Sequence, residues 1–164
     1  MKEFLGEEEL SVEQAANIAR AMWHVAEAEK GVHQHEREMI DGFYHGCCAE
    51  KGTEPEEISA HPWDPAEALR LLNTASLREM LLRSCLLLGY ADGEFSPAER
   101  ALVEQIARQL EVPGERLESI DREVKRVLLS QFEDVTIFRD ATYDIGKHLG
   151  MSRAEVDAVL DEHA

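Results

Sequence analysis

Two ten-residue segments align without gaps, 63 positions apart: Ala28-Glu29-Lys30-Gly31-Val32-His33-Gln34-His35-Glu36-Arg37 and Ala91-Asp92-Gly93-Glu94-Phe95-Ser96-Pro97-Ala98-Glu99-Arg100. Each copy has a carboxylate where one apolar periodic segment ends. Each copy also has a Glu-Arg pair seven positions later, where the next periodic segment begins. The repeat predicts two related hairpins, each made of a helix, a short acidic turn and a second helix.

Helix starts are marked elsewhere by the same kind of local signal. A serine followed three positions later by Glu or Gln occurs at Ser11, Ser76, Ser96 and Ser152, and Asp64-Pro65 adds a capping residue followed by proline. No segment alternates apolar and polar residues as a strand does. These patterns predict an all-α bundle of about seven or eight helices, built from two pseudo-repeated helix-turn-helix halves.

The halves span about residues 11–50 and 76–112. The segment 51–63 between them contains two prolines and a glycine, which favours a linker with at most one helical turn. Each apolar stripe needs a partner to cover it, so the two halves are expected to share one core in a single domain over 1–164.

The formal net charge is −17, from 34 acidic and 17 basic residues. This balance argues against nucleic-acid binding, which depends on clusters of Lys and Arg that release counterions from phosphates. Cations and basic protein surfaces are the compatible partners. The alternative is that the high net charge only keeps the protein in solution and serves no specific partner.

The expected location is the cytoplasm. Three cysteines do not form a secreted disulfide framework. The N-terminus lacks the features of a signal peptide, and no stretch of about 18 apolar residues is present. The oligomeric state is left open by the sequence.

The segment Leu88 to Arg100, with the boundary Leu110-Glu111-Val112-Pro113 and the late segment Leu149 to Val156, resembles the TerB family of tellurite-resistance proteins and TerB-like domains. The resemblance runs from about residue 11 to the end and is strongest at Asp92-Gly93 and Glu99. It implies an all-helical domain with a pseudo-twofold, without catalytic activity, whose acidic motifs bind a divalent cation. It also implies a link to tellurite resistance or a stress response, and association with a membrane-linked complex.

In the second copy, Asp92, Glu94 and Glu99 are the predicted metal ligands. Carboxylate oxygens suit hard cations such as calcium or magnesium, although the spacing is not that of an EF-hand loop. The structural alternative is that Glu99 completes a capping box with Ser96, and that Asp92-Gly93 is a helix-terminating turn.

In the first copy, Glu29, His33 and Glu36 are the predicted ligands, with His24, Glu27 and His35 as secondary candidates. The family's Asp-Gly is replaced here by Glu29-Lys30, with a glycine at the next position. His33 stands where the second copy has Ser96, so Glu36 has no hydroxyl partner for a capping box. Imidazole nitrogens favour a transition metal over calcium.

These observations predict a TerB-like cytoplasmic binding module that binds a divalent metal ion of unknown identity. The alternatives are an acidic protein–protein adaptor without metal and a helical histidine-carboxylate metalloprotein. Catalysis by a Cys-His pair is not expected, because nothing around Cys47 and Cys48 marks an electropositive site.

Overall fold

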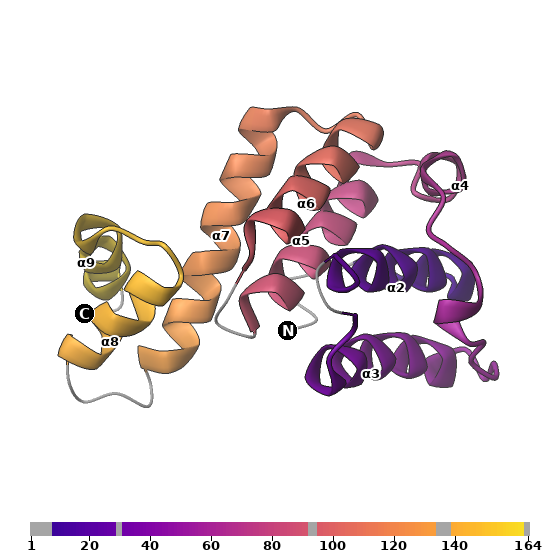
Figure 1. Ribbon diagram of the computed structural model, residues 1–164, viewed down its shortest axis with the longest axis horizontal. Coiled ribbons are helices and arrows are strands. Elements are labelled where there is room, and N and C mark those ends of the chain that lie inside the picture. The colour runs from indigo at the N-terminus through magenta and orange to yellow at the C-terminus, as the bar shows by residue number, and fades with distance from the viewer. Residues whose placement is uncertain (1–7, 29–30, 92–94, 134–138, 163–164) are drawn as a thin grey trace. The chain divides into compact units, whose positions relative to one another are not determined.

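The computed structural model describes residues 8–28, 31–91, 95–133 and 139–162. For residues 131–133 and 139–141 it describes the main chain alone. These residues contain eight α-helices, one short 3-10 helix and no strand (Figure 1). The elements are α2 (Val12–Ala26), α3 (Gln34–Glu50), η1 (Ile58–Ala60), α4 (Pro65–Leu71), α5 (Ala75–Ala91), α6 (Pro97–Gln109), α7 (Gly114–Glu133), α8 (Arg139–His148) and α9 (Arg153–Glu162). The all-α prediction is confirmed.

The two hairpins predicted from the repeat are α2–α3 and α5–α6. Both helices of the second hairpin begin 63 positions after their counterparts in the first. Helix α2 contacts α3 on one side and α5 on the other (Figure 1). The repeated sequence therefore corresponds to a repeated unit of structure.

Side-chain caps fix most of the helix starts. The Ser11–Gln14 pair and the Ser152–Glu155 pair each form both bonds of a capping box. The Asp64 carboxylate accepts a bond from the Ala66 N–H at 3.0 Å. The start of α5 differs from the prediction, because Thr74 rather than Ser76 accepts the bond from the Leu77 N–H, at 3.2 Å.

The core lies where α5 packs against α2 and α6. Helix α5 is buried on most of its faces, which agrees with its continuous apolar sequence. Ile18 of α2, Ile40 of α3 and Leu81 of α5 are fully buried. Each such side chain contributes about 1.5–3 kcal/mol by leaving water.

The segment expected to be a linker also packs. Within it, Ile58 of η1 and Trp63 are buried, and η1 contacts α2. The indole N–H of Trp63 donates a hydrogen bond to the Asn17 Oδ1 at 3.2 Å. The linker is therefore part of the structure around α2.

The chain divides into two compact units, residues 1–117 and 118–164. The first contains both hairpins, η1 and α4. In the second, α8 packs against α9, and Tyr143 is hydrogen-bonded to Asp157. The single domain over 1–164 stays a prediction.

No helix within the described ranges combines the length and the apolar character needed to cross a membrane.

Candidate functional site

The first predicted site lies at the start of α3. The Glu36 carboxylate is buried, with 2% of the residue exposed. Its Oε2 accepts a hydrogen bond from the main-chain N–H of His33 at 2.9 Å. Although His33 supplies no hydroxyl, the carboxylate half of the capping box forms, because a main-chain N–H is a donor whatever the side chain. The positive end of the α3 dipole also favours the carboxylate.

Two of the three secondary candidates, His24 and Glu27, are engaged in packing and hydrogen bonds. The His24 ring stacks on Trp63, with ring centroids 6.0 Å apart. The Glu27 carboxylate accepts a bond from the Trp23 indole N–H at 2.8 Å. His35 is exposed on α3, and Glu29 lies outside the described residues.

In the second copy, Ser96 and Glu99 form a complete capping box at the start of α6. The Glu99 Oε2 accepts from the Ser96 N–H at 3.2 Å, and the Ser96 hydroxyl accepts from the Glu99 N–H at 3.1 Å. The capping role weighed as the alternative for Glu99 is therefore confirmed. Asp92 and Glu94 lie outside the described residues.

An aromatic contact anchors the second hairpin beside this cap. The Arg100 guanidinium lies 4.9 Å from the centre of the Phe95 ring and donates a hydrogen bond to the Tyr90 hydroxyl at 2.8 Å. Arg37, its counterpart in the first copy, lies 5.3 Å from the Trp23 ring. The repeated arginine thus stabilises each hairpin through a cation–π contact.

Within the described part of the chain, no three His, Cys, Asp or Glu side chains are grouped closely enough to hold a metal ion. Three of the six residues predicted as principal ligands, Glu29, Asp92 and Glu94, are outside that part. Of the others, Glu36 and Glu99 occupy equivalent positions in the two copies and cap equivalent helices.

The cysteines are all free thiols. Cys48 and Cys85 are buried, and burial raises the pKa of Cys85 to about 12. That thiol is therefore protonated at neutral pH and is not a nucleophile.

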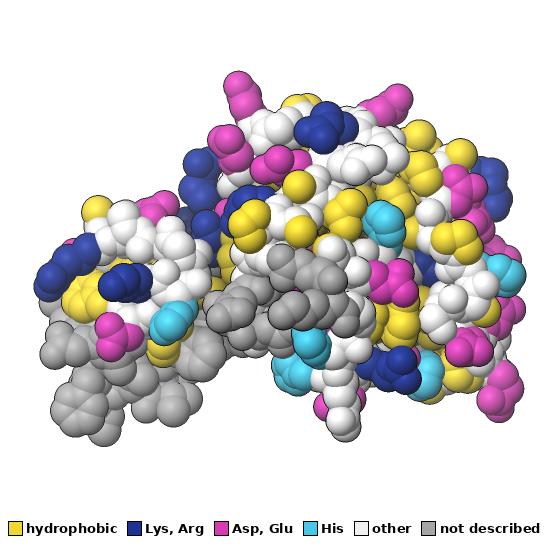
Figure 2. All heavy atoms as spheres, viewed as in Figure 1, with side chains coloured by type: hydrophobic (Ala, Val, Ile, Leu, Met, Phe, Trp, Pro, Cys, Tyr) yellow, Lys and Arg dark blue, Asp and Glu magenta, His cyan; other side chains and the backbone are white. Residues whose placement is uncertain are grey.

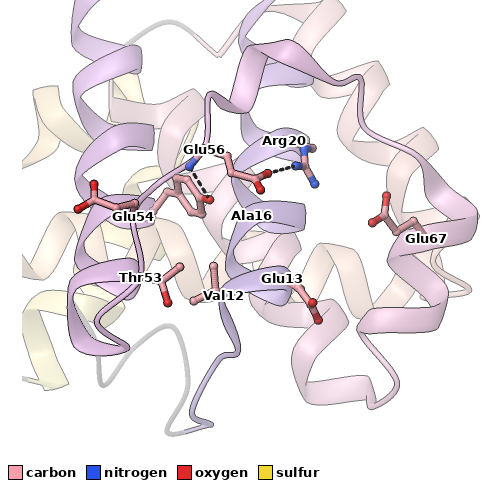
Figure 3. Close-up of a pocket in the computed structure, with 9 residues that line it drawn as sticks. Val12, Glu13, Ala16, Arg20, Thr53, Glu54, Glu56 and Glu67 are labelled. Carbon is pink, nitrogen blue, oxygen red and sulfur yellow. Dashed lines mark hydrogen bonds and ion pairs between the residues drawn. The ribbon is translucent and has the colours of Figure 1, made fainter.

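A pocket that was not predicted lies in the first unit beside α2, with a volume of about 210 Å³. Its lining comes from α2, from Tyr44 of α3, from the segment that precedes η1 and from α4 (Figure 3). The lining residues are Val12, Glu13, Ala16, Arg20, Tyr44, Thr53, Glu54, Glu56 and Glu67.

Two interactions hold one wall of this pocket. A Glu56 carboxylate oxygen lies 3.8 Å from the Arg20 guanidinium, and the Glu56 main-chain N–H donates to the Tyr44 hydroxyl at 3.2 Å (Figure 3). Burial raises the pKa of Tyr44, so its hydroxyl stays protonated at neutral pH. The sequence contains a signal for the ion pair between Arg20 and Glu56. Arg20 is the only Lys or Arg between Val12 and Ala28, and the linker carries several glutamates.

Residues 56–122 match the family model described as tellurite resistance protein TerB. The match includes α5, α6 and the second acidic turn, so the resemblance to TerB is confirmed over this segment. No curated protein and no solved structure matches the chain.

Proposed function

We propose that this chain, which carries a TerB segment at residues 56–122, is a non-catalytic binding module that takes up a divalent cation at the acidic turns of its hairpins. The observation that carries the proposal is the equivalence of Glu36 and Glu99. Two carboxylates related by the repeat are each held at a helix start beside an acidic turn. We further propose that the module acts in the cytoplasm, in tellurite resistance or a related stress response.

Capping and metal binding are chemically compatible. The capping bonds of Glu36 and Glu99 both use Oε2. A carboxylate offers two oxygens with about four lone-pair sites, so one group can serve a main-chain N–H and a cation together. The cap also restricts the conformations of the glutamate side chain. Less conformational entropy is therefore lost when this side chain binds a cation.

The ligand set we propose for the second turn is Asp92, Glu94 and Glu99, which suits a hard cation. For the first turn it is Glu29, His33 and Glu36, with His35 nearby in sequence. His24 and Glu27 are less suitable, because they already contact Trp63 and Trp23. The cation would offset the repulsion between neighbouring carboxylates.

Calorimetry with calcium, magnesium, zinc and nickel tests the proposal. We expect heats of binding for the wild type that fall markedly in Asp92→Asn/Glu99→Gln. Gln at the third helical position already completes the Ser11 cap in this chain, so the variant removes charge while keeping the cap. The control is Glu115→Gln/Glu118→Gln, which removes two exposed charges from α7. Equal heats in all three proteins, or no heat with any of the four metals, would overturn the proposal.

The second candidate function is an acidic adaptor for a basic protein partner. The net charge of −17 favours it. On the face shown in Figure 2, acidic side chains are spread over the surface and are not gathered in one patch. An adaptor predicts association that weakens with salt and does not respond to a chelator.

A further inference from the structure

One flank of α3 is apolar and lies at the outer edge of the first unit. Met39, Gly42 and Gly46 recur at intervals of three and four residues, so they share one side of the helix. Phe43, four positions after Met39, lies on the same side. Both glycines are exposed, whereas Met39 and Phe43 are half-buried. Among the described helices, α3 makes its extensive contact with α2 (Figure 1), so the described part of the chain leaves this flank largely open.

The two glycines are not required by the packing or the conformation of the described chain. A Cβ added at Gly42 or Gly46 would meet no atom within 4 Å, and neither residue has a positive φ. Glycine inside a helix is unfavourable relative to alanine, but it lets another backbone approach closely. The pair therefore marks a place where an element from another molecule can approach α3.

The second hairpin shows the same flank when its own chain covers it. The residue equivalent to Phe43 is Ile106 of α6, which is 1% exposed. Helix α6 contacts α2 as well as α5. The residues equivalent to the two glycines are Gln105 and Gln109. Glycines thus occur in the hairpin whose flank stays open and are replaced in the hairpin whose flank is covered.

We propose that this flank of α3 binds the same flank of a second molecule of this chain, with the two helices antiparallel about a twofold axis beside Gly42 and Phe43. Residues at equal distances on the two sides of such an axis face each other. Met39 then faces Gly46 of the second molecule, and Phe43 faces Gly42. Two bulky side chains enter the spaces that two glycines leave, and each contact occurs twice.

The two ends of this seam are complementary in charge. His35 and Glu50 are both exposed and lie at equal distances from the axis. The His35 imidazole N–H can donate to the Glu50 carboxylate, which can accept it in addition to interactions within its own chain. Antiparallel helices also place the positive end of each helix dipole beside the negative end of the other. A parallel pair would bring like ends together, so the charges favour the antiparallel arrangement.

The dimer should be weak and should respond to salt in a characteristic way. The seam on each molecule consists of His35, Met39, Gly42, Phe43, Gly46 and Glu50, far fewer than the roughly 20–30 residues on each side of a standard interface. Two molecules with a net charge of −17 also repel each other. Salt screens this repulsion and should strengthen the dimer, whereas it should weaken the binding of a basic partner.

Sedimentation equilibrium of the full chain, in about 150 mM NaCl with a chelator, tests the proposal. We expect monomer and dimer in exchange as the protein concentration rises toward the millimolar range. Gly42→Gln/Gly46→Gln should raise the Kd of the dimer by about tenfold or more, because the new side chains fill the spaces that Met39 and Phe43 enter. The control Ala101→Gln/Ala158→Gln adds the same side chains at exposed positions of α6 and α9 and should dimerise like the wild type.

The glycine variant should remain folded, which keeps the test interpretable. Glutamines at these positions meet no atom of their own chain within reach of Cβ, and the second hairpin already carries glutamine at both equivalent positions. Circular dichroism of dilute protein should therefore show unchanged helix content. Equal dimerisation of this variant and the wild type would overturn the proposal, and so would a chain that stays monomeric at all concentrations.

An exchange of the residues at the ends of the seam tests its direction. His35→Glu should weaken the dimer, because it places two carboxylates against each other. Adding Glu50→His restores both pairs in the opposite sense and should return the Kd to near the wild-type value. A double variant no stronger than His35→Glu would overturn the antiparallel seam. Because a chelator is present, a chain that binds metals but stays monomeric would overturn the dimer and leave cation binding at the turns intact.

Discussion

Glu36 and Glu99 stand at equivalent positions of the repeat and cap equivalent helices. Each accepts a hydrogen bond from the main-chain N–H three positions earlier. The hydroxyl that completes the cap is present at Ser96 and replaced by His33 in the first copy. The glutamate is thus the part of the cap that both copies keep, which makes it the residue to test for stability and for the proposed cation binding.

We expect Glu36→Ala to lower the free energy of unfolding by about 1–2 kcal/mol, because it removes a buried side chain and leaves the partly buried His33 N–H without its acceptor. Glu36→Gln should lose distinctly less, since an amide oxygen accepts the same bond. Urea unfolding followed by circular dichroism measures both. Equal losses in the two variants would contradict the capping account.

Thiol accessibility provides a second prediction for single residues. Cys48 and Cys85 are buried, and burial holds the pKa of Cys85 at about 12, whereas Cys47 is half-buried. A thiol reagent at pH 8 should therefore label Cys47 first, and Cys85 only after unfolding. Cys47→Ser should remove the early labelling phase. Rapid labelling of Cys85 in the native protein would disprove its burial.

At the scale of elements, two helical glycines have opposite surroundings. A Cβ added at Gly89 of α5 would overlap the Phe95 ring, whereas one at Gly42 of α3 would meet no atom within 4 Å. Gly89→Ala should therefore lower the free energy of unfolding by about 1–3 kcal/mol. Gly42→Ala should raise it by about 0.5–1 kcal/mol through helix propensity. Thermal unfolding of the two variants compares them, and an effect of the same sign in both would refute this account.

The start of α9 should be sensitive to acid. Hydrogen bonds from the main chain and side chain of Ser152 lower the pKa of Glu155. A carboxyl with a lowered folded pKa stabilises the fold above its unfolded pKa of about 4.3, and this contribution is lost as pH falls through the folded pKa. The stability difference between wild type and Glu155→Gln should shrink as pH falls from about 6 to about 3. A difference that stays constant with pH would contradict this linkage.

The local signals predicted the starts of α2, α4, α6 and α9, and at the start of α5 the repeat agrees with the structure better than the local motif does. The offset of 63 places Thr74 opposite Ser11, and Thr74 is the residue that caps α5, although Ser76 has the stronger local motif. The pocket could not be predicted in the same way. It combines α2 with residues up to 55 positions away, from Val12 to Glu67 of α4, and only tertiary packing brings them together.

For the whole molecule, charge is the dominant property. With a net charge of −17, the folded chain concentrates negative charge that the unfolded chain spreads over a larger volume. The described ion pairs, such as Arg78–Glu111 and Lys125–Asp121, offset only part of it. Repulsion among the remaining carboxylates therefore opposes folding, and it also makes the surface receptive to cations and basic partners.

Salt should consequently stabilise this protein. Raising NaCl from about 10 mM to about 150 mM shortens the Debye length from about 30 Å to about 8 Å and screens the repulsion, so Tm should rise. At matched ionic strength, a divalent salt should raise Tm further if cations bind specifically, by an amount that grows with the logarithm of concentration above Kd. Asp92→Asn/Glu99→Gln should keep the response to NaCl and lose part of the extra response to the divalent salt. A Tm that does not change with NaCl would show that repulsion among the carboxylates contributes little to the stability of this fold. Relief of that repulsion could then not drive the binding of cations or basic partners.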